Sequence, residues 1–368
     1  MILGIDASQA NRQIRSGTEW YAFYLFREFK RLLREREDVT VRLYVRDVLQ
    51  ADLASLVENF SAQGGPATGW EVRVLRWPLK YFWGQVRLSW EMLVHPPDVL
   101  FCPAHTIPLL HPKKTFTTLH DVGFEDYPEL YDWKSRLYHR WSARLAVRQA
   151  SHIFTVSNFS KERIVENYQC SPEKLSVTHL GIDTNFSTAK NVSMGDFVLY
   201  VGRLEPKKNV LNLIKGYEMA EVSKELILAG PKINTGDIEA YLAERPKLAA
   251  KIKLLGYIEE ERKRQLYQNA ALFLFPTLYE GFGLPILEAQ AVGIPVITSN
   301  TGSNPEVAGE GAVLVDPESP YEIAKAIKAL LTNEKFREDT IKAGRENINR
   351  FSWQVTARKT LEIILSPE

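Results

Sequence analysis

The chain has 368 residues, which is enough for two domains that each bury a hydrophobic core. Its hydrophobic content of 45% and charged content of 25% are ordinary for a globular protein, and a net charge of +1 disfavours nucleic acid as a partner. The cysteines, Cys102 and Cys170, favour a reduced protein with buried thiols over a disulfide or a zinc site. The opening MILGID is typical of a buried strand rather than a signal peptide, and no apolar run reaches the ~20 residues of a membrane span.

The first half alternates between strand-like and helix-like segments. Ser16 and Glu19 have capping-box spacing, which predicts a helix that begins near Glu19. Further helices are predicted over 134–149 and 160–167. The predicted strands are 1–6, 39–45, 70–77, 98–104, 114–121, 151–157 and 175–183.

The second half repeats this alternation after a polar break. Residues 184–196 lack periodicity, which predicts a linker. Strands that alternate with helices favour parallel sheets. We therefore predict an α/β protein with a Rossmann-like, acceptor-binding domain over 1–183, a second, nucleotide-sugar donor-binding one over 197–350, and a C-terminal helix within 351–368 that packs back toward the first domain. Two such domains would leave a ligand cleft between the carboxyl ends of their strands.

The strongest functional pattern is YEGFGLPILE, Tyr279–Glu288. A buried strand runs into a glycine turn, and Pro285 suits the first position of the helix that follows. The glycines let the backbone approach a ligand, and free amides at a helix start can bind an anion or a hydroxyl. Glu280 and Glu288 bracket the turn with carboxylates that can accept from sugar and ribose hydroxyls. For either glutamate alone, a structural role near the helix N-terminus is the alternative.

A second pattern, VGRLEPKKN, places cations between a strand and a helix at Val201–Asn209. A departing diphosphate builds up negative charge, which arginine can chelate with two hydrogen bonds and lysine can meet as a point charge. Such a preplaced pair can replace a metal ion. A solvated basic turn is the alternative, but the position after the first strand of the second domain favours the functional interpretation.

These patterns together resemble the retaining GT-B glycosyltransferases of family 4, and the resemblance runs through nearly the whole chain. The matching segments are GRLEPKKN, EGFGLPILE, AVGIPVITSN, HDVGFEDYPELY (120–131), VSNFSKERI (156–164) and HLGID (179–183). The resemblance implies GT-B architecture, with two Rossmann-like domains facing a central cleft. It also implies a nucleotide-sugar donor, retention of anomeric configuration, and no metal or other cofactor.

The resemblance also implies a donor-binding set in the second half. Arg203 and Lys208 would bind the diphosphate, and Glu280 would hold the donor sugar as a catalytic residue. Glu288 would take the ribose hydroxyls, and backbone near Tyr257 would lie by the base. The backbone of the glycine turn would complete the sugar site through Gly281, Phe282, Gly283 and Leu284.

His120 is the second catalytic residue that the resemblance implies. It ends a strand of the first half, where the family has a histidine that reaches the donor sugar across the cleft. A structural histidine is the alternative. Many relatives carry paired glycines in the N-terminal loop where this chain has Ser16-Gly17, which leaves Gly17 to approach the phosphates or the acceptor.

Other chemistries find little support in the sequence. No GxGxxG follows the first strand of either half, and there is no P-loop, HExxH or GxSxG. A glycan phosphorylase would be much longer and would need a pyridoxal cofactor. A nucleotide-sugar-binding protein without turnover is the alternative of another class, but the intact Arg203, Lys208, Glu280 and Glu288 favour an enzyme.

Aromatic and basic residues gather in the first half, which predicts a face that rests on anionic lipid. A helix with a core stripe and a solvated stripe is the alternative. The residues concerned are Arg76, Trp77, Lys80, Trp83, Arg87, Trp90, Trp133, Arg136, Leu137, Arg140, Trp141, Arg144, Leu145 and Arg148.

The sequence therefore predicts a retaining, metal-independent transferase that moves a hexose from a nucleotide-diphosphate donor to a glycan or lipid-linked acceptor. Mannose from GDP-mannose is the favoured donor. UDP-glucose and UDP-N-acetylhexosamine are the alternatives. The protein is expected in the cytoplasm or peripherally at the inner face of the membrane.

Overall fold

The computed structural model describes residues 1–58, 69–79, 81–183, 186 and 195–366. Clustering of contacts divides the chain into two compact units. The N-terminal unit consists of Met1–Gly181 and Ser352–Glu368, and the C-terminal unit consists of Ile182–Phe351. Most of the predicted linker over 184–196 lies outside the described residues.

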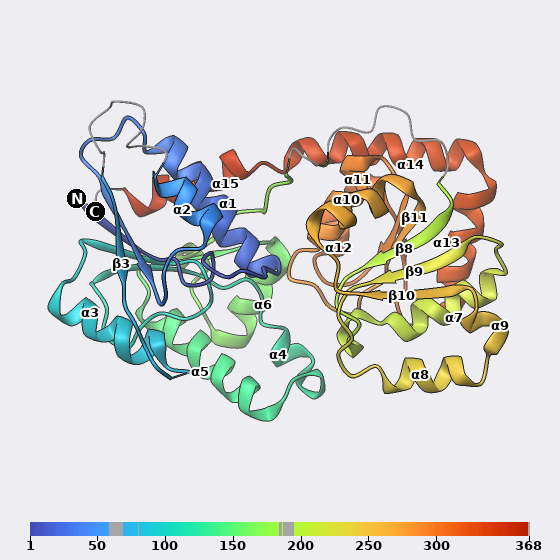
Figure 1. Ribbon diagram of the computed structural model, residues 1–368, viewed down its shortest axis with the longest axis horizontal. Helices are drawn as coiled ribbons and strands as arrows, with labels where there is room; N and C mark the ends of the chain where they lie inside the picture. The colour runs from blue at the N-terminus through green and yellow to red at the C-terminus, as the bar shows by residue number, and fades with distance from the viewer. Residues whose placement is uncertain (59–68, 80, 184–185, 187–194, 367–368) are drawn as a thin grey trace. The chain divides into compact units, whose positions relative to one another are not determined.

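A parallel sheet forms the centre of the N-terminal unit, with the strand order β3-β2-β1-β4-β5-β6-β7 (Figure 1). Parallel strands covered on both faces require continuous apolar sequence, and the VLFC of β4 is buried along its whole length. All seven strands predicted for the first half are present: β1 (Ile2–Asp6), β2 (Thr40–Val45), β3 (Trp70–Val74), β4 (Val99–Cys102), β5 (Lys114–Thr118), β6 (His152–Thr155) and β7 (Leu175–Val177).

Helices cover both faces of this sheet (Figure 1). The first begins at the predicted capping box, where the Glu19 carboxylate accepts from the backbone N–H of Ser16 at 3.0 Å. The helical segments are α1 (Gly17–Leu32), α2 (Ala51–Glu58), η2 (Trp83–Leu88), α3 (Ser89–Val94), α4 (Gly123–Asp126), η3 (Pro128–Leu130), α5 (Trp133–Gln149), α6 (Asn158–Tyr168), η4 (Pro172–Lys174) and α15 (Trp353–Ile364).

The last helix, α15, packs in the N-terminal unit. The buried ring of Trp353 stacks on Tyr24 of α1, with 5.2 Å between centroids. The Thr356 hydroxyl donates to the carbonyl of His179. An aromatic stack and a hydrogen bond therefore tie the end of the chain to its first half.

The C-terminal unit has its own parallel sheet, with the order β10-β9-β8-β11-β12-β13. Its central strand β11 reads AALFLF and is buried throughout. The strands are β8 (Phe197–Val201), β9 (Glu225–Ala229), β10 (Ile252–Gly256), β11 (Ala270–Phe275), β12 (Val296–Ser299) and β13 (Val313–Val315). The helical segments are η6 (Pro206–Lys208), α7 (Val210–Ala220), α8 (Gly236–Ala243), α9 (Pro246–Ala249), α10 (Glu260–Asn269), α11 (Leu284–Val292), α12 (Asn304–Ala308), η7 (Gly309–Gly311), α13 (Pro320–Thr332), α14 (Glu334–Asn347) and η8 (Ile348–Arg350).

The π-helical segment η2 and helix α3 were not predicted from the sequence. Their solvent-facing side chains are apolar: Val86, Trp90 and Leu93 are each at least half exposed. The polar residues Gln85, Ser89 and Glu91 are buried instead, so the usual pattern of a polar outer face is reversed here.

Candidate active site

The glycine turn before α11 has the predicted strand–turn–helix geometry. Gly283 caps the helix in the left-handed conformation, with φ of 96°. A Cβ there would lie 2.9 Å from Oδ1 of Asn304, so only glycine fits without a shift. Pro285 occupies the first turn of α11, which begins at Leu284. The amide end of this helix is a suitable place for an anion or a sugar hydroxyl.

Lys208 and Glu280, which are 72 residues apart in the chain, form an ion pair of 2.5 Å. Their side chains are only 13% and 12% exposed. Lys208 ends the short helix η6 after β8, while Glu280 precedes the glycine turn after β11. Burial lowers the pKa of Lys208, and the Glu280 carboxylate opposes that shift. The two predicted patterns are therefore joined by one buried ionic contact.

The backbone at Glu280 is held by the segment after β12. The Ser303 hydroxyl donates to the Glu280 carbonyl at 2.9 Å. Gly302, with φ of 65°, approaches so closely that a Cβ would lie 3.1 Å from the Glu280 nitrogen. This packing fixes the direction in which the Glu280 side chain leaves the turn.

Glu288 lies on α11, one helical turn after its first residue Leu284, and is 5% exposed. Its carboxylate accepts from the ammonium of Lys263 on α10 at 2.9 Å. The same ammonium contacts Glu260 at 2.9 Å. Burial acts to lower the pKa of Lys263, but the two carboxylates outweigh it and raise that pKa. Lys263 was missed in the sequence because it lies in an ordinary charged helix, EERKRQLYQN.

The remaining predicted donor contacts differ in exposure. The Arg203 side chain is 52% exposed and pairs with Glu205 at 3.2 Å. Tyr257 follows β10 and is 58% exposed. Gly281 is buried, and Phe282 packs its ring against Phe351 at 5.7 Å. The Phe282 side chain thus belongs to the core, and its backbone is the part suited to contact a ligand.

The two predicted residues of the first half lie in the N-terminal unit. His120 is 8% exposed and packs edge-on against Tyr21, with 4.7 Å between ring centroids. Its Nε2 donates to the carbonyl of Pro103 at 3.0 Å. Burial lowers the His120 pKa, which favours a neutral ring with an unprotonated Nδ1. Gly17 opens α1, and a side chain there would meet no neighbour within 4 Å.

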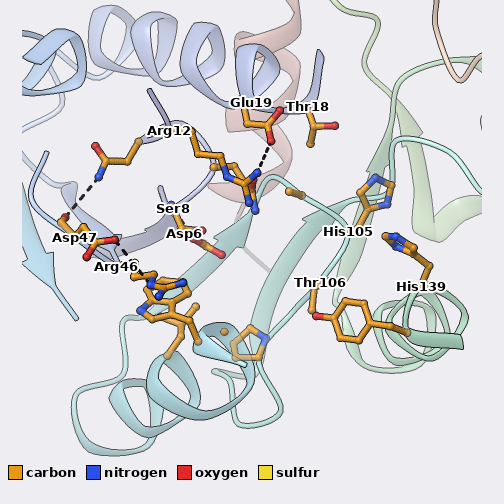
Figure 2. Close-up of a pocket in the computed structure, with 18 of the residues that line it drawn as sticks. Asp6, Ser8, Arg12, Thr18, Glu19, Arg46, Asp47, His105, Thr106 and His139 are labelled. Carbon is orange, nitrogen blue, oxygen red and sulfur yellow. Dashed lines mark hydrogen bonds and ion pairs between the residues drawn. The ribbon is translucent and has the colours of Figure 1, made fainter. Parts of the chain in front are cut away.

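The N-terminal unit also contains a cavity of about 570 Å³ at the carboxyl ends of β1, β2 and β4 (Figure 2). This site was not predicted from the sequence, although polar residues directly after strands were a usable signal. Its lining includes Asp6, Ser8, Asn11, Arg12, Thr18, Glu19, Arg46, Asp47, Trp83, His105, Thr106, Tyr138 and His139.

Comparison with known proteins identifies the family. The model of Glycosyltransferase Family 4 matches residues 15–186, and that of Glycosyl transferases group 1 matches residues 182–347. O-antigen chain mannosyltransferase B of Escherichia coli is 30% identical over 264 residues, which cover 68% of this chain and 69% of that protein. The chain belongs to the glycosyltransferases of family 4, whose second half is the group 1 domain.

Other glycosyltransferases are similar to this one in sequence or in fold. O-antigen chain mannosyltransferase RfbU of Salmonella typhimurium is 28% identical over 258 residues, covering 70% of this chain and 71% of that protein. Among solved structures, Anabaena HepE in complex with UDP and glucose superposes with a TM-score of 0.71 at 20% identity, over 100% of this chain and 99% of HepE. WaaG, a glycosyltransferase involved in lipopolysaccharide biosynthesis, reaches 0.71 at 16% identity, over 100% of each chain. The fold is therefore GT-B, as the sequence predicted.

No helix among the described residues combines the length and the apolar character that a membrane span requires.

Proposed function

We propose that this glycosyltransferase is a retaining, metal-independent enzyme that moves a hexose from a nucleotide-diphosphate donor to a glycan or lipid-linked acceptor. The buried Lys208–Glu280 pair beside the glycine turn carries the proposal. When a cation and a carboxylate lie together at the start of a helix, the cation can bind a diphosphate while the carboxylate accepts from a sugar hydroxyl.

In this proposal the C-terminal unit binds the donor. Lys208 and the more exposed Arg203 neutralise the charge that develops on the departing diphosphate. Glu280 and the backbone from Gly281 to Leu284 hold the sugar. Glu288, held in place by its hydrogen bond from Lys263, accepts from the ribose hydroxyls, and the backbone near Tyr257 borders the base.

Independence from metal follows from the two cations, and it is tested with a chelator. Turnover should survive an excess of EDTA. A strict requirement for manganese or magnesium would contradict the role given to Arg203 and Lys208. Retention is supported by family resemblance alone, and proton NMR of the first product decides it, since an inverted anomer would contradict it.

The donor is proposed to be GDP-mannose, because curated relatives are named mannosyltransferases. UDP-glucose and UDP-N-acetylhexosamine are the alternatives, since HepE was solved with UDP and glucose. A thermal-shift panel of UDP, GDP, ADP and their sugars separates them, because a ligand that binds only the folded state raises the unfolding temperature. Slow hydrolysis of the donor without acceptor distinguishes an enzyme from a protein that only binds nucleotide sugars.

His120 is proposed to contact the donor sugar rather than the nucleotide. His120→Ala should then lower turnover strongly and leave the affinity for free nucleoside diphosphate unchanged. Calorimetry with the nucleotide and with the nucleotide sugar measures both. Lost nucleotide affinity, or full turnover, would return His120 to a structural role.

We also propose that the N-terminal unit rests on an anionic membrane from the cytoplasmic side. On α5, the exposed Trp133, Leu137 and Trp141 share one face with the exposed Arg144 and Arg148, because their spacings of four and three residues follow the helical repeat. Apolar residues that enter the interface and cations that meet lipid phosphates are what such a surface requires.

A second exposed apolar set lies beside α5. Phe82 and Trp90, of the η2–α3 region, are 62% and 60% exposed. Leu145 of α5 packs against the core cluster that contains Leu88 and Met92, which joins the two elements. Four of the predicted residues do not add to this surface in the same way. Arg140 pairs with Glu125 at 2.9 Å, and Arg87 pairs with Glu91 at 3.0 Å. Trp83 is buried, which corrects its predicted place on this face, and Lys80 lies outside the described residues.

Vesicle co-sedimentation tests this surface. The protein should bind phosphatidylglycerol-containing vesicles better than phosphatidylcholine vesicles. Trp133→Ser with Trp141→Ser should abolish binding, and Arg144→Gln with Arg148→Gln should weaken it about 30-fold, at ~1 kcal/mol per cation. Tyr321→Ser, at an aromatic residue of the C-terminal unit that is 66% exposed, is the matched control. Equal binding by all variants would contradict the proposal.

A further inference from the structure

His105, which follows β4, has an unusual backbone conformation. Its φ is 46°, in the left-handed region that residues with a side chain avoid. Residues held in such conformations cluster at functional sites, because the surrounding structure must enforce them. The strain at His105 therefore raises the question of what its ring does.

Two neighbouring elements enforce this conformation. The backbone N–H of His105 donates to the carbonyl of Thr118, at the end of β5, at 2.8 Å. The hydroxyl of Ser142, on α5, approaches the His105 carbonyl at 3.3 Å and the Thr106 hydroxyl at 2.8 Å. Ser142 is 1% exposed. Hydrogen bonds to β5 and to α5 thus hold the loop, and the fold sets the direction of the His105 side chain.

The His105 ring lines the 570 Å³ cavity of the N-terminal unit. Figure 2 shows it beside His139 at one side of the cavity, and its centroid lies 5.2 Å from that of His120. Among the residues that the structure describes, no protein group hydrogen-bonds to either ring nitrogen. Burial, and then the neighbouring His120, lower the pKa of His105, so the ring is neutral and offers one donor and one acceptor.

The rest of the cavity is suited to hydroxyl groups rather than to an anion. Arg12 pairs with Glu19 at 3.1 Å, and Arg46 lies 3.8 Å from Asp47. The third carboxylate of the lining, Asp6, accepts from the N–H of Ser8 at 2.9 Å, and burial raises its pKa. Acidic groups therefore match or outnumber the cations. Carboxylates accept hydrogen bonds from hydroxyls and would repel a phosphate.

The sequence already predicts an acceptor-binding first domain. We propose that His105 binds a hydroxyl of the acceptor's terminal sugar, and that this sugar is uncharged where it enters the cavity. The proposal rests on the proposed glycosyltransferase function and names the chemistry of its acceptor. The strained loop presents a neutral donor and acceptor to the sugar, and the Asp6 carboxylate accepts from a further hydroxyl. The rings of Trp83 and Tyr138, which also line the cavity, offer apolar surface to the sugar ring.

Two substitutions separate binding by the ring from a structural role. His105→Gly removes the ring and also the strain, so its unfolding temperature should equal or exceed that of the wild type. His105→Asn tolerates the left-handed backbone and keeps a donor and an acceptor. His95→Asn changes a mostly exposed histidine that is not among the cavity-lining residues and serves as the control.

Binding is measured by saturation-transfer NMR with methyl α-mannoside, methyl α-glucoside and methyl α-N-acetylglucosaminide, and with glycerol 1-phosphate as the anionic probe. At least one glycoside should bind the wild type and the control. That glycoside should bind His105→Gly about 3- to 10-fold more weakly, the loss expected for one hydrogen bond, and His105→Asn should lie between them. Affinity for GDP and UDP should be the same in all four proteins.

Three results would overturn the proposal: no glycoside binding to the wild type, a preference for glycerol 1-phosphate, or undiminished glycoside binding by His105→Gly. The nucleotide titration keeps this failure apart from failure of the proposed function, because the proposed nucleotide contacts all lie in the C-terminal unit. A wild type that binds glycosides but no nucleotide would refute the donor site alone.

Discussion

Replacing Lys208 with methionine should destabilise the C-terminal unit and weaken diphosphate binding together. Removing one partner of a buried ion pair costs about 3–5 kcal/mol, and side chains that are 13% and 12% exposed put this pair near the lower end, about 3 kcal/mol. Losing a charged hydrogen bond to phosphate costs about 1.5–3 kcal/mol, or roughly a 10- to 150-fold loss of affinity. The double variant Lys208→Met/Glu280→Gln leaves no unpaired charge, so it should be more stable than the sum of the single changes predicts.

The chain offers a way to assign the unfolding to one unit. All eight tryptophans belong to the N-terminal unit, so tryptophan fluorescence reports that unit, while circular dichroism reports both. Lys208→Met should move the circular dichroism transition in urea, and calorimetry with GDP and UDP measures the affinity. Arg203→Met is the matched control. The Arg203 side chain is 52% exposed, so losing its pair with Glu205 should cost under about 1 kcal/mol while affinity still falls. A Lys208→Met protein with wild-type stability and affinity would refute this reasoning.

Three further predictions concern other parts of the molecule. Glu288→Gln should weaken nucleotide binding by about 10-fold or more. Lys263→Met should weaken it less, because Lys263 only orients the Glu288 carboxylate. Calorimetry with the nucleotide measures both variants, and a larger loss of affinity in Lys263→Met would contradict this assignment. Gly283→Ala should destabilise the C-terminal unit by about 1–3 kcal/mol, measured by circular dichroism in urea, because alanine is strained at φ of 96°. The pKa values of His105 and His120 are lowered by folding, so the unfolded state binds more protons below pH ~6.5. For each of these histidines, the free energy of unfolding of the N-terminal unit should therefore fall by up to about 1.4 kcal/mol per pH unit as the pH falls. Unfolding followed by tryptophan fluorescence should show a smaller fall for His105→Asn than for the wild type.

The fold could be predicted from the sequence because its strands are local apolar runs. Strands such as DVLFCPA and ALFLFP are short, buried and bounded by polar loops, and their alternation with helices indicates parallel sheets. The η2–α3 region could not be predicted, because its helical face toward solvent carries Val86, Trp90 and Leu93 instead of polar residues. A prediction from periodicity fails where the outer face is apolar.

The candidate site was only partly accessible from the sequence. The glycine turn is local, so Gly283 and Pro285 could be assigned from their neighbours. The Lys208–Glu280 and Lys263–Glu288 pairs join residues that are 72 and 25 positions apart, and single-sequence patterns carry no information about such contacts. The strain at His105 depends on hydrogen bonds from two other elements, so nothing in CPAHTIP marks it.

The most direct test of the proposed enzyme is release of nucleoside diphosphate from a panel of nucleotide sugars. The purified wild type, Glu280→Gln and His120→Ala would be incubated with GDP-mannose, UDP-glucose and UDP-N-acetylglucosamine, with EDTA present. One donor, GDP-mannose by this proposal, should be turned over selectively by the wild type and at least 100-fold more slowly by both variants, the scale of about 3 kcal/mol of transition-state stabilisation. Equal release by the wild type and Glu280→Gln, or no selective release from any donor, would contradict the account.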